Sequence, residues 1–324
     1  MQEKFQPQLM KPFVKEALWG GNRLRENWGK QAPPEMTNVA EAWELSTHPH
    51  GLSKIATGEF ADKTFKQYLQ EAGREILGRK HQSEDLSILV KYIDAADNLS
   101  IQVHPDDQYA KEHNLPSGKT EMWYVVEATP GAYIYYGFNK KIDKAEFEQR
   151  IAEQTLPEVL QQIKVKAGES YFIPAGTLHA IGPGCLIAEI QQSSDTTYRI
   201  YDYGRRDKDG NLRELHVEQA KEVTKLEPCP LPESQPVIDL RDGNQSQLIS
   251  KCPFFQVHKV NIAQAIGGHV SSESFQLLMN LGEPLALVAE NGQMTVEHGQ
   301  SVFLAAGMGK YHLQGHGELL VVTL

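Results

Sequence analysis

The stretch "GESYFIPAGTLH" at residues 168–179 ends a strand-like run in a glycine- and proline-containing turn and then presents a histidine. Gly168, Pro174 and Gly176 are spaced so that the turn is rigid and the imidazole of His179 comes to a fixed position. A fixed imidazole is what a metal site needs, and its other ligands must then come from elsewhere in the chain.

Two further stretches carry donor atoms on strand faces. Alternation in "NLSIQVHPDD" places Gln102 and His104 on one face, and in "KTEMWYVVEA" Lys119 and Glu121 share a face. A histidine at a strand end, or a glutamine on a strand, is commonplace, so the prediction depends on the whole set. The predicted metal ligands are Gln102, His104, Glu121 and His179. These nitrogen and oxygen donors suit zinc or another divalent transition metal, and an open coordination position would make it a Lewis acid.

Short apolar or alternating runs, separated by glycine, proline and Asp-Asn turn signals, fill most of the chain and predict antiparallel β-structure. Helical periodicity interrupts this pattern at residues 62–78 and at residues 141–163. In the second segment Asp143 and Glu146 have the spacing of a capping box, and Pro157 is expected to kink or restart the helix. The two segments are therefore expected to decorate a β-domain.

An internal repeat divides the chain. Residues 299–311, "GQSVFLAAGMGKY", match the turn that carries His179 position for position, with Lys310 in the place of that histidine. Laying "SFQLLMNLG" on "TEMWYVVEA" puts Phe275 opposite Glu121, and the second helical segment accounts for the longer spacing in the first copy.

Four prolines within residues 225–236 indicate a linker between the two copies. We therefore predict two related β-domains, residues 1–228 and residues 237–324. The second is expected to be degenerate and metal-free, because two ligand positions are replaced there. The strands before about residue 60 either belong to the first domain or complete the sheets of the second domain.

The composition narrows the functional classes. A chain of 324 residues can form two domains without disulfides, and a net charge of −10 argues against nucleic acid as a main partner. A small anionic ligand needs only a local group of Lys and Arg. The three cysteines, Cys185, Cys229 and Cys252, lack C-x-x-C spacing and indicate a reducing compartment. Since no apolar run is long enough to span a membrane, we expect a cytoplasmic protein with no membrane partner, of undetermined oligomeric state.

The Gly-x5-Pro-x-Gly-x2-His element is the second cupin motif, and the Gln-x-His…Glu pattern is similar to a variant of the first. With "IPAGTLHAIG", "SSDTTYRIYDYGR", "ALWGGNRL" and "EAWELSTHP", they give most of the chain a resemblance to the type I mannose-6-phosphate isomerases in their short bacterial form. The cupin motif alone also occurs in dioxygenases, storage proteins and sugar-binding regulators, whereas the combined set is much more specific. The resemblance implies an all-β dominated fold of two cupin jelly-roll domains, with helical insertions in the N-terminal one.

The same resemblance implies a zinc-dependent aldose–ketose isomerase that interconverts mannose 6-phosphate and fructose 6-phosphate through a cis-enediol or enediolate. Its partner is then a small-molecule sugar phosphate, and it holds one Zn²⁺ per chain. Carried over by position, the zinc ligands are those predicted above, and Arg199 is the catalytic arginine. The alternating Thr, Arg and Tyr of "TTYRIYDYG" are too polar for a plain core, which favours an inward Arg199 that stabilises the enediolate or holds phosphate.

Three more residues are candidates for contact with the substrate. Lys119 is either the base that moves the proton, made more acidic by a nearby dication, or a substrate-contacting or surface cation. Glu44 is either a carboxylate of the site or part of a structural strand. Trp19 either walls a sugar site or packs in an ordinary core.

Two rival functions remain open from the sequence. An iron-dependent cupin oxygenase would keep positions free for dioxygen, and a glutamine ligand argues against it. A non-enzymatic sugar-binding regulator would need neither a base nor a metal. The metal content of the purified protein distinguishes the three.

Overall fold

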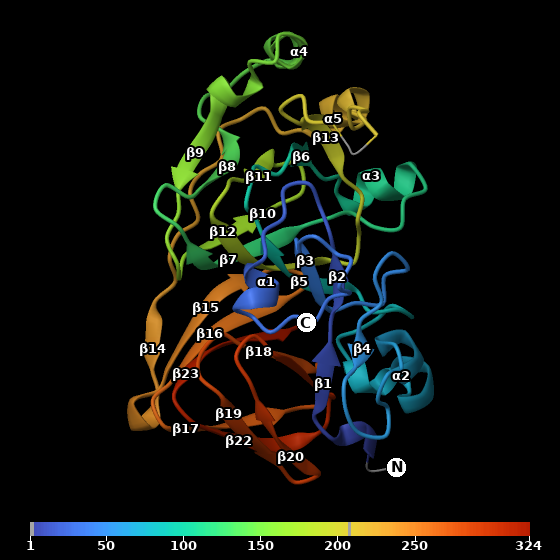
Figure 1. Ribbon diagram of the computed structural model, residues 1–324, viewed down its shortest axis with the longest axis vertical. Helices are drawn as coiled ribbons and strands as arrows, with labels where there is room; N and C mark the ends of the chain where they lie inside the picture. Colours follow the sequence, from blue (N-terminus) through green and yellow to red (C-terminus); the bar gives the residue numbers. More distant parts are fainter. Residues whose placement is uncertain (1–2, 207–208) are drawn as a thin grey trace.

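Antiparallel β-structure dominates the molecule, as the alternating sequence pattern predicts. The structure is a computed structural model and describes residues 3–206 and 209–324. Its strands form four sheets, which pair into two β-domains along the long axis of the molecule, with green and yellow strands at one end and orange and red strands at the other (Figure 1). Among the described residues, no helix has the length and apolar character that would carry it across a membrane.

The first domain is built from two sheets. The six-stranded sheet contains, in spatial order, β10 (Ser170–Ile173), β7 (Glu121–Ala128), β12 (Cys185–Gln192), β5 (Ile88–Asp94), β3 (Glu41–Leu45) and β2 (Phe13–Lys15). The five-stranded sheet contains β13 (Tyr198–Tyr201), β6 (Ile101–Val103), β11 (His179–Ile181), β8 (Tyr133–Phe138) and β9 (Leu160–Lys164).

The second domain repeats this plan. The eight-stranded sheet contains β14 (Val237–Asp239), β15 (Gln245–Lys251), β16 (Gln256–Ile262), β23 (Gly317–Thr323), β18 (Gln276–Asn280), β21 (Ser301–Leu304), β1 (Gln8–Lys11) and β4 (Lys54–Ile55). The four-stranded sheet contains β17 (Ala265–Val270), β22 (Gly309–Gln314), β19 (Leu285–Ala289) and β20 (Gly292–Val296).

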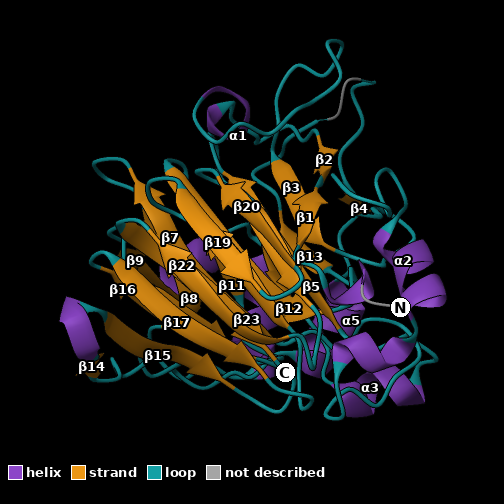
Figure 2. Cartoon of the chain, turned by 90° about the horizontal axis from the view of Figure 1, so that it is seen from below, coloured by secondary structure: helices purple, strands orange, loops and turns teal. Residues whose placement is uncertain are grey.

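Helices are few and lie outside the sheets, as Figure 2 shows in purple. The α-helices are α1 (Arg23–Glu26), α2 (Phe65–Ala72), α3 (Asp107–Glu112), α4 (Lys144–Ala152) and α5 (Val217–Val223). The short 3-10 helices are Glu3–Phe5, Arg74–Leu77, Leu156–Val159 and Arg241–Gly243. The fold is therefore the pair of cupin-type β-domains with added helices that the sequence predicts.

Strand β7 contributes to two cores at once. Trp123 points into the first barrel, where it packs in an apolar cluster with Ile173. Met122 and Tyr124 lie on the opposite face and join a second cluster with Phe303 of the eight-stranded sheet. The two large sheets thus pack face to face, and this shared core explains why the central strands are apolar on both faces.

The first strand of the chain belongs to the second domain. β1 pairs with β21 through Gln8 and Phe303, and β4 pairs with β1 through Met10 and Ile55. β2 and β3 instead extend the six-stranded sheet of the first domain. The sequence leaves open which domain the first strands join. The structure places β1 and β4 in the second domain, so the first domain is not the contiguous segment 1–228 that the sequence predicts. The added strands cover an edge of β21 that would otherwise expose unpaired backbone groups.

The first helical segment is confirmed. α2 and the short helix after it occupy most of residues 62–78, and Phe65 and Leu69 are buried on the inner face. Thr64 and Gln67 form a reciprocal capping box at the start of α2. The cap satisfies backbone N–H groups that the helix cannot pair internally.

The second helical segment, residues 141–163, is helical only in its first part. α4 begins after Asp143, whose side chain accepts a hydrogen bond from the backbone N–H of Glu146 at 2.8 Å. From Leu160 onward the chain is strand β9, paired with β8, so the helical prediction is wrong there. Pro157 lies in the first turn of the short helix before β9, where its missing N–H costs nothing, and helical structure ends within a turn of it.

The predicted repeat is present in the backbone. Gly168 and Gly299 have φ values of 92° and 76°, and Gly176 and Gly307 have φ values of 86° and 82°. Residues with a Cβ rarely adopt this left-handed region, so both copies need glycine at the same turn positions.

The register of the repeat differs by one residue from the prediction. Ile173 pairs with Glu121 in the first copy, and its counterpart Leu304 pairs with Gln276 in the second. Gln276, and not Phe275, is therefore the equivalent of Glu121. Phe275 lies on the opposite strand face, in the core between the domains. A shift of one residue exchanges the two faces of a strand, and the apolar run "FQLLM" shows no alternation that could fix the register.

Inside the second barrel, two uncharged side chains, Gln276 and Tyr311, form a pair where the first barrel has Glu121 and His179. Tyr311 lies in the apolar cluster of that barrel, and its hydroxyl donates a hydrogen bond to Oε1 of Gln276 at 2.8 Å. Lys310, which aligns with His179, is exposed. Neither of the two aligned positions offers an ionisable group to the interior.

Candidate metal centre and pocket

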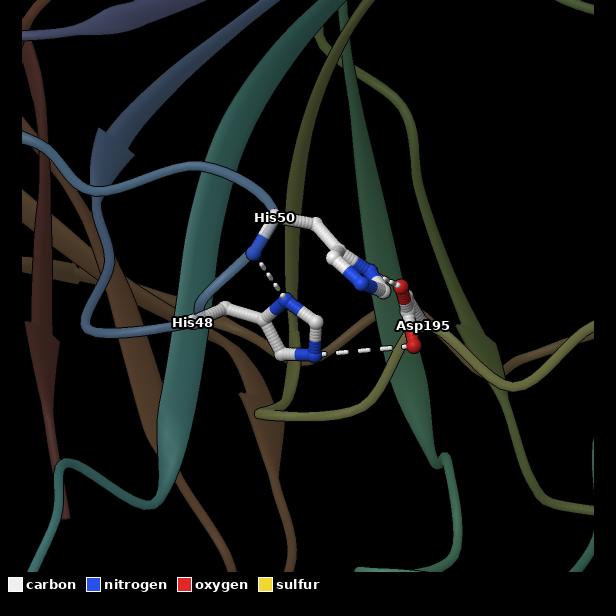
Figure 3. Close-up of side chains that lie close together, drawn as sticks. All are labelled: His48, His50 and Asp195. Atoms are coloured by element: carbon white, nitrogen blue, oxygen red, sulfur yellow. Dashed lines mark hydrogen bonds and ion pairs between the residues drawn. The ribbon is translucent and has the colours of Figure 1, made fainter.

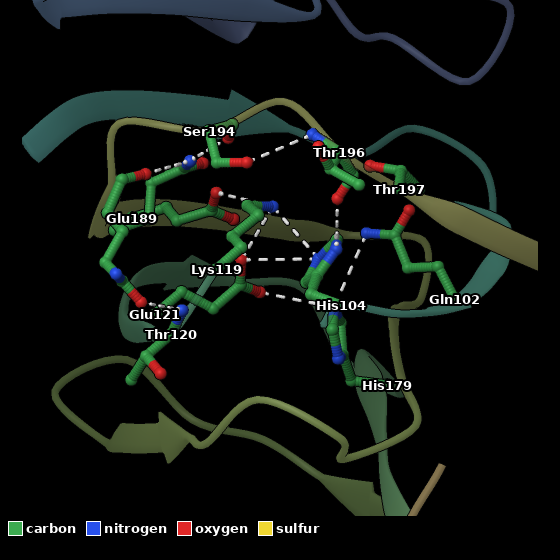
Figure 4. Close-up of polar contacts among 12 residues, drawn as sticks. Gln102, His104, Lys119, Thr120, Glu121, His179, Glu189, Ser194, Thr196 and Thr197 are labelled. Carbon is green, nitrogen blue, oxygen red and sulfur yellow. Dashed lines mark hydrogen bonds and ion pairs between the residues drawn. The ribbon is translucent and has the colours of Figure 1, made fainter. Parts of the chain in front are cut away.

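Three of the predicted ligands meet in the interior of the first barrel. His104 follows β6 directly, Glu121 begins β7, and His179 begins β11. All three are buried, and their candidate ligand atoms lie within 4.8 Å of one another (Figure 4). Oε1 of Glu121 is 3.2 Å from Nε2 of His179, and Oε2 is 3.6 Å from Nε2 of His104.

Backbone carbonyls fix the orientation of both imidazoles. Nδ1 of His104 lies 2.8 Å from the carbonyl oxygen of Thr196, and Nδ1 of His179 lies 2.9 Å from that of Thr177. Each Nδ1 therefore carries the proton, and each Nε2 presents a lone pair toward Glu121. Burial lowers the pKa of both histidines, so the neutral form that a metal ligand requires is favoured.

The charges of the cluster fit a bound cation. Both carboxylate oxygens of Glu121 are buried, and Oε1 has no hydrogen-bonding partner among the described residues. The ammonium of Lys119 supplies positive charge instead, 2.7 Å from Oε2 of Glu121 and 3.0 Å from Nε2 of His104. A buried carboxylate that faces two neutral imidazoles is the donor set of a divalent transition metal.

Gln102 borders the same group. Its side-chain nitrogen is assigned 3.5 Å from Nε2 of His179, and the two residues are paired across β6 and β11. Rotation of the amide by 180° would turn the oxygen toward the histidines, and the oxygen is the atom that can bind a metal. All four predicted ligands are thus brought together.

A polar pocket of about 370 Å³ borders this cluster through Gln102 and Lys119. Its lining includes Trp19, Lys91, Gln102, Lys119, Glu189 and Arg199. Trp19, which the sequence left as a sugar wall or a packing residue, is 7% exposed and lies both in the apolar core and at the pocket. Lys119 is buried, so its interpretation as a surface cation is wrong.

A row of alternating charges extends from the cluster along the pocket. Nζ of Lys119 is 3.8 Å from Glu189, Nζ of Lys91 is 3.0 Å from Glu189, and Nζ of Lys91 is 3.5 Å from Glu41. Burial alone would lower the pKa of Lys91, but Glu189 and Glu41 hold it above its usual value. The pocket therefore places carboxylates and amines in alternation next to the candidate metal site.

Sequence reasoning missed Lys91 and Glu189. Both interrupt apolar strands, "ILVKYID" and "CLIAEIQQ", in which every residue is buried. Charged side chains are almost never buried without a partner, so this isolation within an apolar run was the available signal.

Arg199 lies at the pocket, on the inward face that the sequence favours. Its Nε donates to Oγ of Ser100 at 3.2 Å, and its Nη1 donates to the carbonyl oxygen of Glu214 at 3.1 Å. Burial and the neighbouring Arg213 lower the pKa of Arg199 from its usual high value. A partly desolvated guanidinium held in this way is available to an anionic group in the pocket.

Glu44 is not a residue of the pocket, so its prediction as a substrate contact is wrong. Oε1 of Glu44 lies 2.6 Å from Nζ of Lys30, and Oε2 accepts a hydrogen bond from Oγ of Ser301 at 2.8 Å. Glu41 and Trp43 of the same strand line the pocket instead. Glu44 is three residues after Glu41 in β3. Because side chains alternate between the two faces of a strand, Glu44 lies on the other face, toward the second domain.

Because Glu44 and Lys30 are both buried, we expect the change Glu44→Gln to lower the free energy of unfolding by about 3–5 kcal/mol, the usual cost of leaving a buried charge unpaired. The same change at the half-exposed Glu71, which pairs with Lys63, is expected to cost less than about 1 kcal/mol. Urea unfolding measures both. If Glu44→Gln kept full stability and lost turnover, Glu44 would have to act in the pocket after all.

The fold and the site together define a double-cupin protein with a candidate transition-metal centre in its first barrel. Residues 8–131 match the family model described as phosphomannose isomerase type I, catalytic domain. Residues 244–324 match the model described as mannose-6-phosphate isomerase, cupin domain.

Relatives agree with these two matches. The chain is 40% identical to a mannose-6-phosphate isomerase of Streptococcus mutans over 81% of its own length and 80% of the relative. It is 34% identical to a mannose-6-phosphate isomerase of Bacillus subtilis over 98% and 99% of the two chains. A crystal structure of mannose 6-phosphate isomerase from Bacillus subtilis superposes with a TM-score of 0.90 at 33% identity, covering 98% of this chain and 99% of that one. The chain belongs to the type I mannose-6-phosphate isomerase family and is by class an isomerase.

Proposed function

We propose that this chain interconverts mannose 6-phosphate and fructose 6-phosphate through a cis-enediolate, with zinc as its metal. The observation that carries the proposal is the buried cluster of His104, Glu121 and His179 next to a pocket that presents Gln102, Lys119 and Arg199. Family membership supports the reaction, and the donor set supports the metal. The substrate is a small sugar phosphate, for which a cationic pocket is suited.

The proposed zinc ligands are Gln102, His104, Glu121 and His179, with one zinc ion held in this way per chain. When bound, zinc supplies Lewis-acid stabilisation of negative charge on oxygen. The carbonyls of Thr196 and Thr177 hold the two imidazoles in the tautomer that binds it.

The remaining residues have roles set by their places in the pocket. Moving a carbonyl between C1 and C2 requires a base that removes a proton from one carbon and returns it to the other. We assign this role to Lys119, whose side chain lines the pocket next to the candidate metal site. Arg199 stabilises the charge that develops on the two oxygens, and Trp19 excludes water from one wall.

The test is direct. Purified protein with zinc should convert mannose 6-phosphate to fructose 6-phosphate at neutral pH without nucleotide, redox cofactor or dioxygen. In the reverse direction in heavy water, mannose 6-phosphate formed from fructose 6-phosphate should carry deuterium at C2 if the base is accessible to solvent. Absence of turnover on every hexose phosphate tried would leave the non-enzymatic sugar binder as the better function, and stoichiometric iron with dioxygen consumption would favour the oxygenase.

The second barrel is expected to play no part in the chemistry. Lys310→Ala should leave turnover and metal content nearly unchanged, because Lys310 is exposed and the interior position beside it is filled by Tyr311. Atomic absorption on the purified variant and a steady-state assay check this. A stoichiometric zinc ion located beyond residue 237 would contradict the interpretation of the second barrel.

A further inference from the structure

A second group of metal-type side chains lies at the rim of the pocket. His48 and His50 come from the loop after β3, and Asp195 comes from the loop after β12 and lines the pocket. Figure 3 shows both imidazoles turned toward the carboxylate. Nε2 of His48 is 3.5 Å from Oδ1 of Asp195, and Nδ1 of His50 is 2.5 Å from Oδ2. The candidate ligand atoms of all three lie within 4.8 Å of one another.

The loop that carries the histidines is closed by its own hydrogen bonds. The backbone N–H of Ser46 donates to Oγ of Ser53 at 2.9 Å, and the N–H of Ser53 donates to the carbonyl of Ser46 at 3.2 Å. The N–H of Gly51 donates to the carbonyl of His48 at 3.0 Å and completes a tight turn. Both imidazoles are thus presented by a backbone that does not depend on Asp195.

The facing loop is also held independently. Oγ1 of Thr197 donates to the carbonyl of Asp195 at 3.3 Å, and the N–H of Thr196 donates to Oγ of Ser194 at 3.3 Å. The carbonyl of Thr196 accepts from His104, which anchors the loop to the buried cluster. The two loops are each held by their own hydrogen bonds and are bridged by the side chains of the rim group, which makes the arrangement pre-organised for a ligand between them.

We propose that His48, His50 and Asp195 form a second site for a divalent transition metal such as zinc, weaker and more exchangeable than the buried one. Two imidazole nitrogens and one carboxylate oxygen suit zinc, nickel or copper rather than magnesium or calcium. The side chains of His50 and Asp195 are 68% and 43% exposed, so water can complete the coordination. The ion would join the loop after β3 to the loop after β12 at the entrance of the pocket.

Proton positions explain why this site should be the weaker one. The backbone N–H of His50 donates to Nδ1 of His48 at 3.2 Å, so neutral His48 carries its proton on Nε2. A metal on Nε2 displaces that proton, and Nδ1 must then take one up and lose its contact with the amide. In the buried cluster both Nδ1 atoms already face carbonyl acceptors, and no such rearrangement is needed.

The single zinc proposed above concerns the buried cluster, and the rim site fills after it. Equilibrium dialysis of the zinc-loaded protein against rising Zn²⁺ at pH 7.5 measures the affinity of both sites. Wild type should bind one ion tightly and a second more weakly. His50→Ala should weaken binding of the second ion by about 10–100-fold or more. Loss of a residue that only hydrogen-bonds to a metal ligand already lowers metal affinity by about that much. Turnover of His50→Ala with one zinc ion should be unchanged.

A matched control is His113→Ala, because His113 is a half-exposed histidine 3.8 Å from a single carboxylate, Glu222, and should leave both ions in place. His179→Ala should lose the tight ion and keep the weak one, which separates this proposal from the proposed function. The proposal is overturned if wild type takes up no second ion at millimolar zinc, or if His50→Ala binds it as tightly as wild type.

Discussion

Replacing His179 with alanine is expected to remove the tightly bound metal and to abolish isomerase activity while the protein remains folded. His179 is 1% exposed and supplies Nε2 at 3.2 Å from Glu121, so its loss opens the donor set. The core of the first barrel is built from apolar clusters that contain none of the candidate ligands, so we expect it to form without the ion. Atomic absorption, circular dichroism and a coupled assay measure the three properties separately.

His312→Ala is the matched control, since this histidine is exposed on β22, the counterpart of β11 in the second barrel. It should keep one tight zinc ion and full turnover. The ligand assignment fails if His179→Ala retains stoichiometric tight metal and wild-type turnover. If His179→Ala fails to fold, Gln102→Ala tests the ligand set instead. It removes a half-buried donor and should weaken metal binding without a large change in stability.

Arg199→Ala is expected to lower kcat by about 10²–10³, with a smaller rise in KM. The guanidinium lies at the pocket and is partly desolvated, and the loss of one donor to a developing oxyanion typically costs that much. Its charge matches the enediolate better than the neutral carbonyl, so the loss should fall on the transition state and not on substrate binding.

Steady-state kinetics in both directions check this expectation. Arg206→Ala is a suitable control, because Arg206 is exposed and its Nη1 donates to the carbonyl of Gly210. A rise in KM with unchanged kcat would make Arg199 a holder of the phosphate group. The isomerase proposal would stand in that case, and the stabilisation of the enediolate would have to come from other residues of the pocket.

The elements nearest to the metal centre could be predicted because their signals are local. The segment before His179 is specified by two glycines, Gly168 and Gly176, which lie in the turns on either side of β10 and have a left-handed backbone that few other residues adopt. Strand alternation placed Gln102 and His104 on one face without knowledge of their neighbours. The ligand set comes together because the turn before His179 joins β10 to β11, β10 pairs with β7 at Glu121, and β11 pairs with β6 at Gln102.

The errors have a different origin. Glu44 and Phe275 were each assigned to the wrong face of a strand, and a face depends on which sheet lies on which side. The short strand "EAWEL" and the apolar run "FQLLM" pack on both faces, so neither sequence shows which side is the interior. Lys91 and Glu189 needed tertiary information of the same kind, since their charges are compensated by each other across neighbouring strands.

The pairing of β1 with β21 has a consequence for how the protein is made. Gln8 leaves the ribosome long before Phe303, its partner. At about 5–20 residues per second, roughly 300 residues of synthesis keep β1 without its partner for roughly 15–60 s. The first domain can form its two sheets in that interval, because β2 and β3 pair with strands made soon after them. The newborn chain therefore pairs β1 late, and a ribosome that stops before β21 would leave β1 without its partner strand.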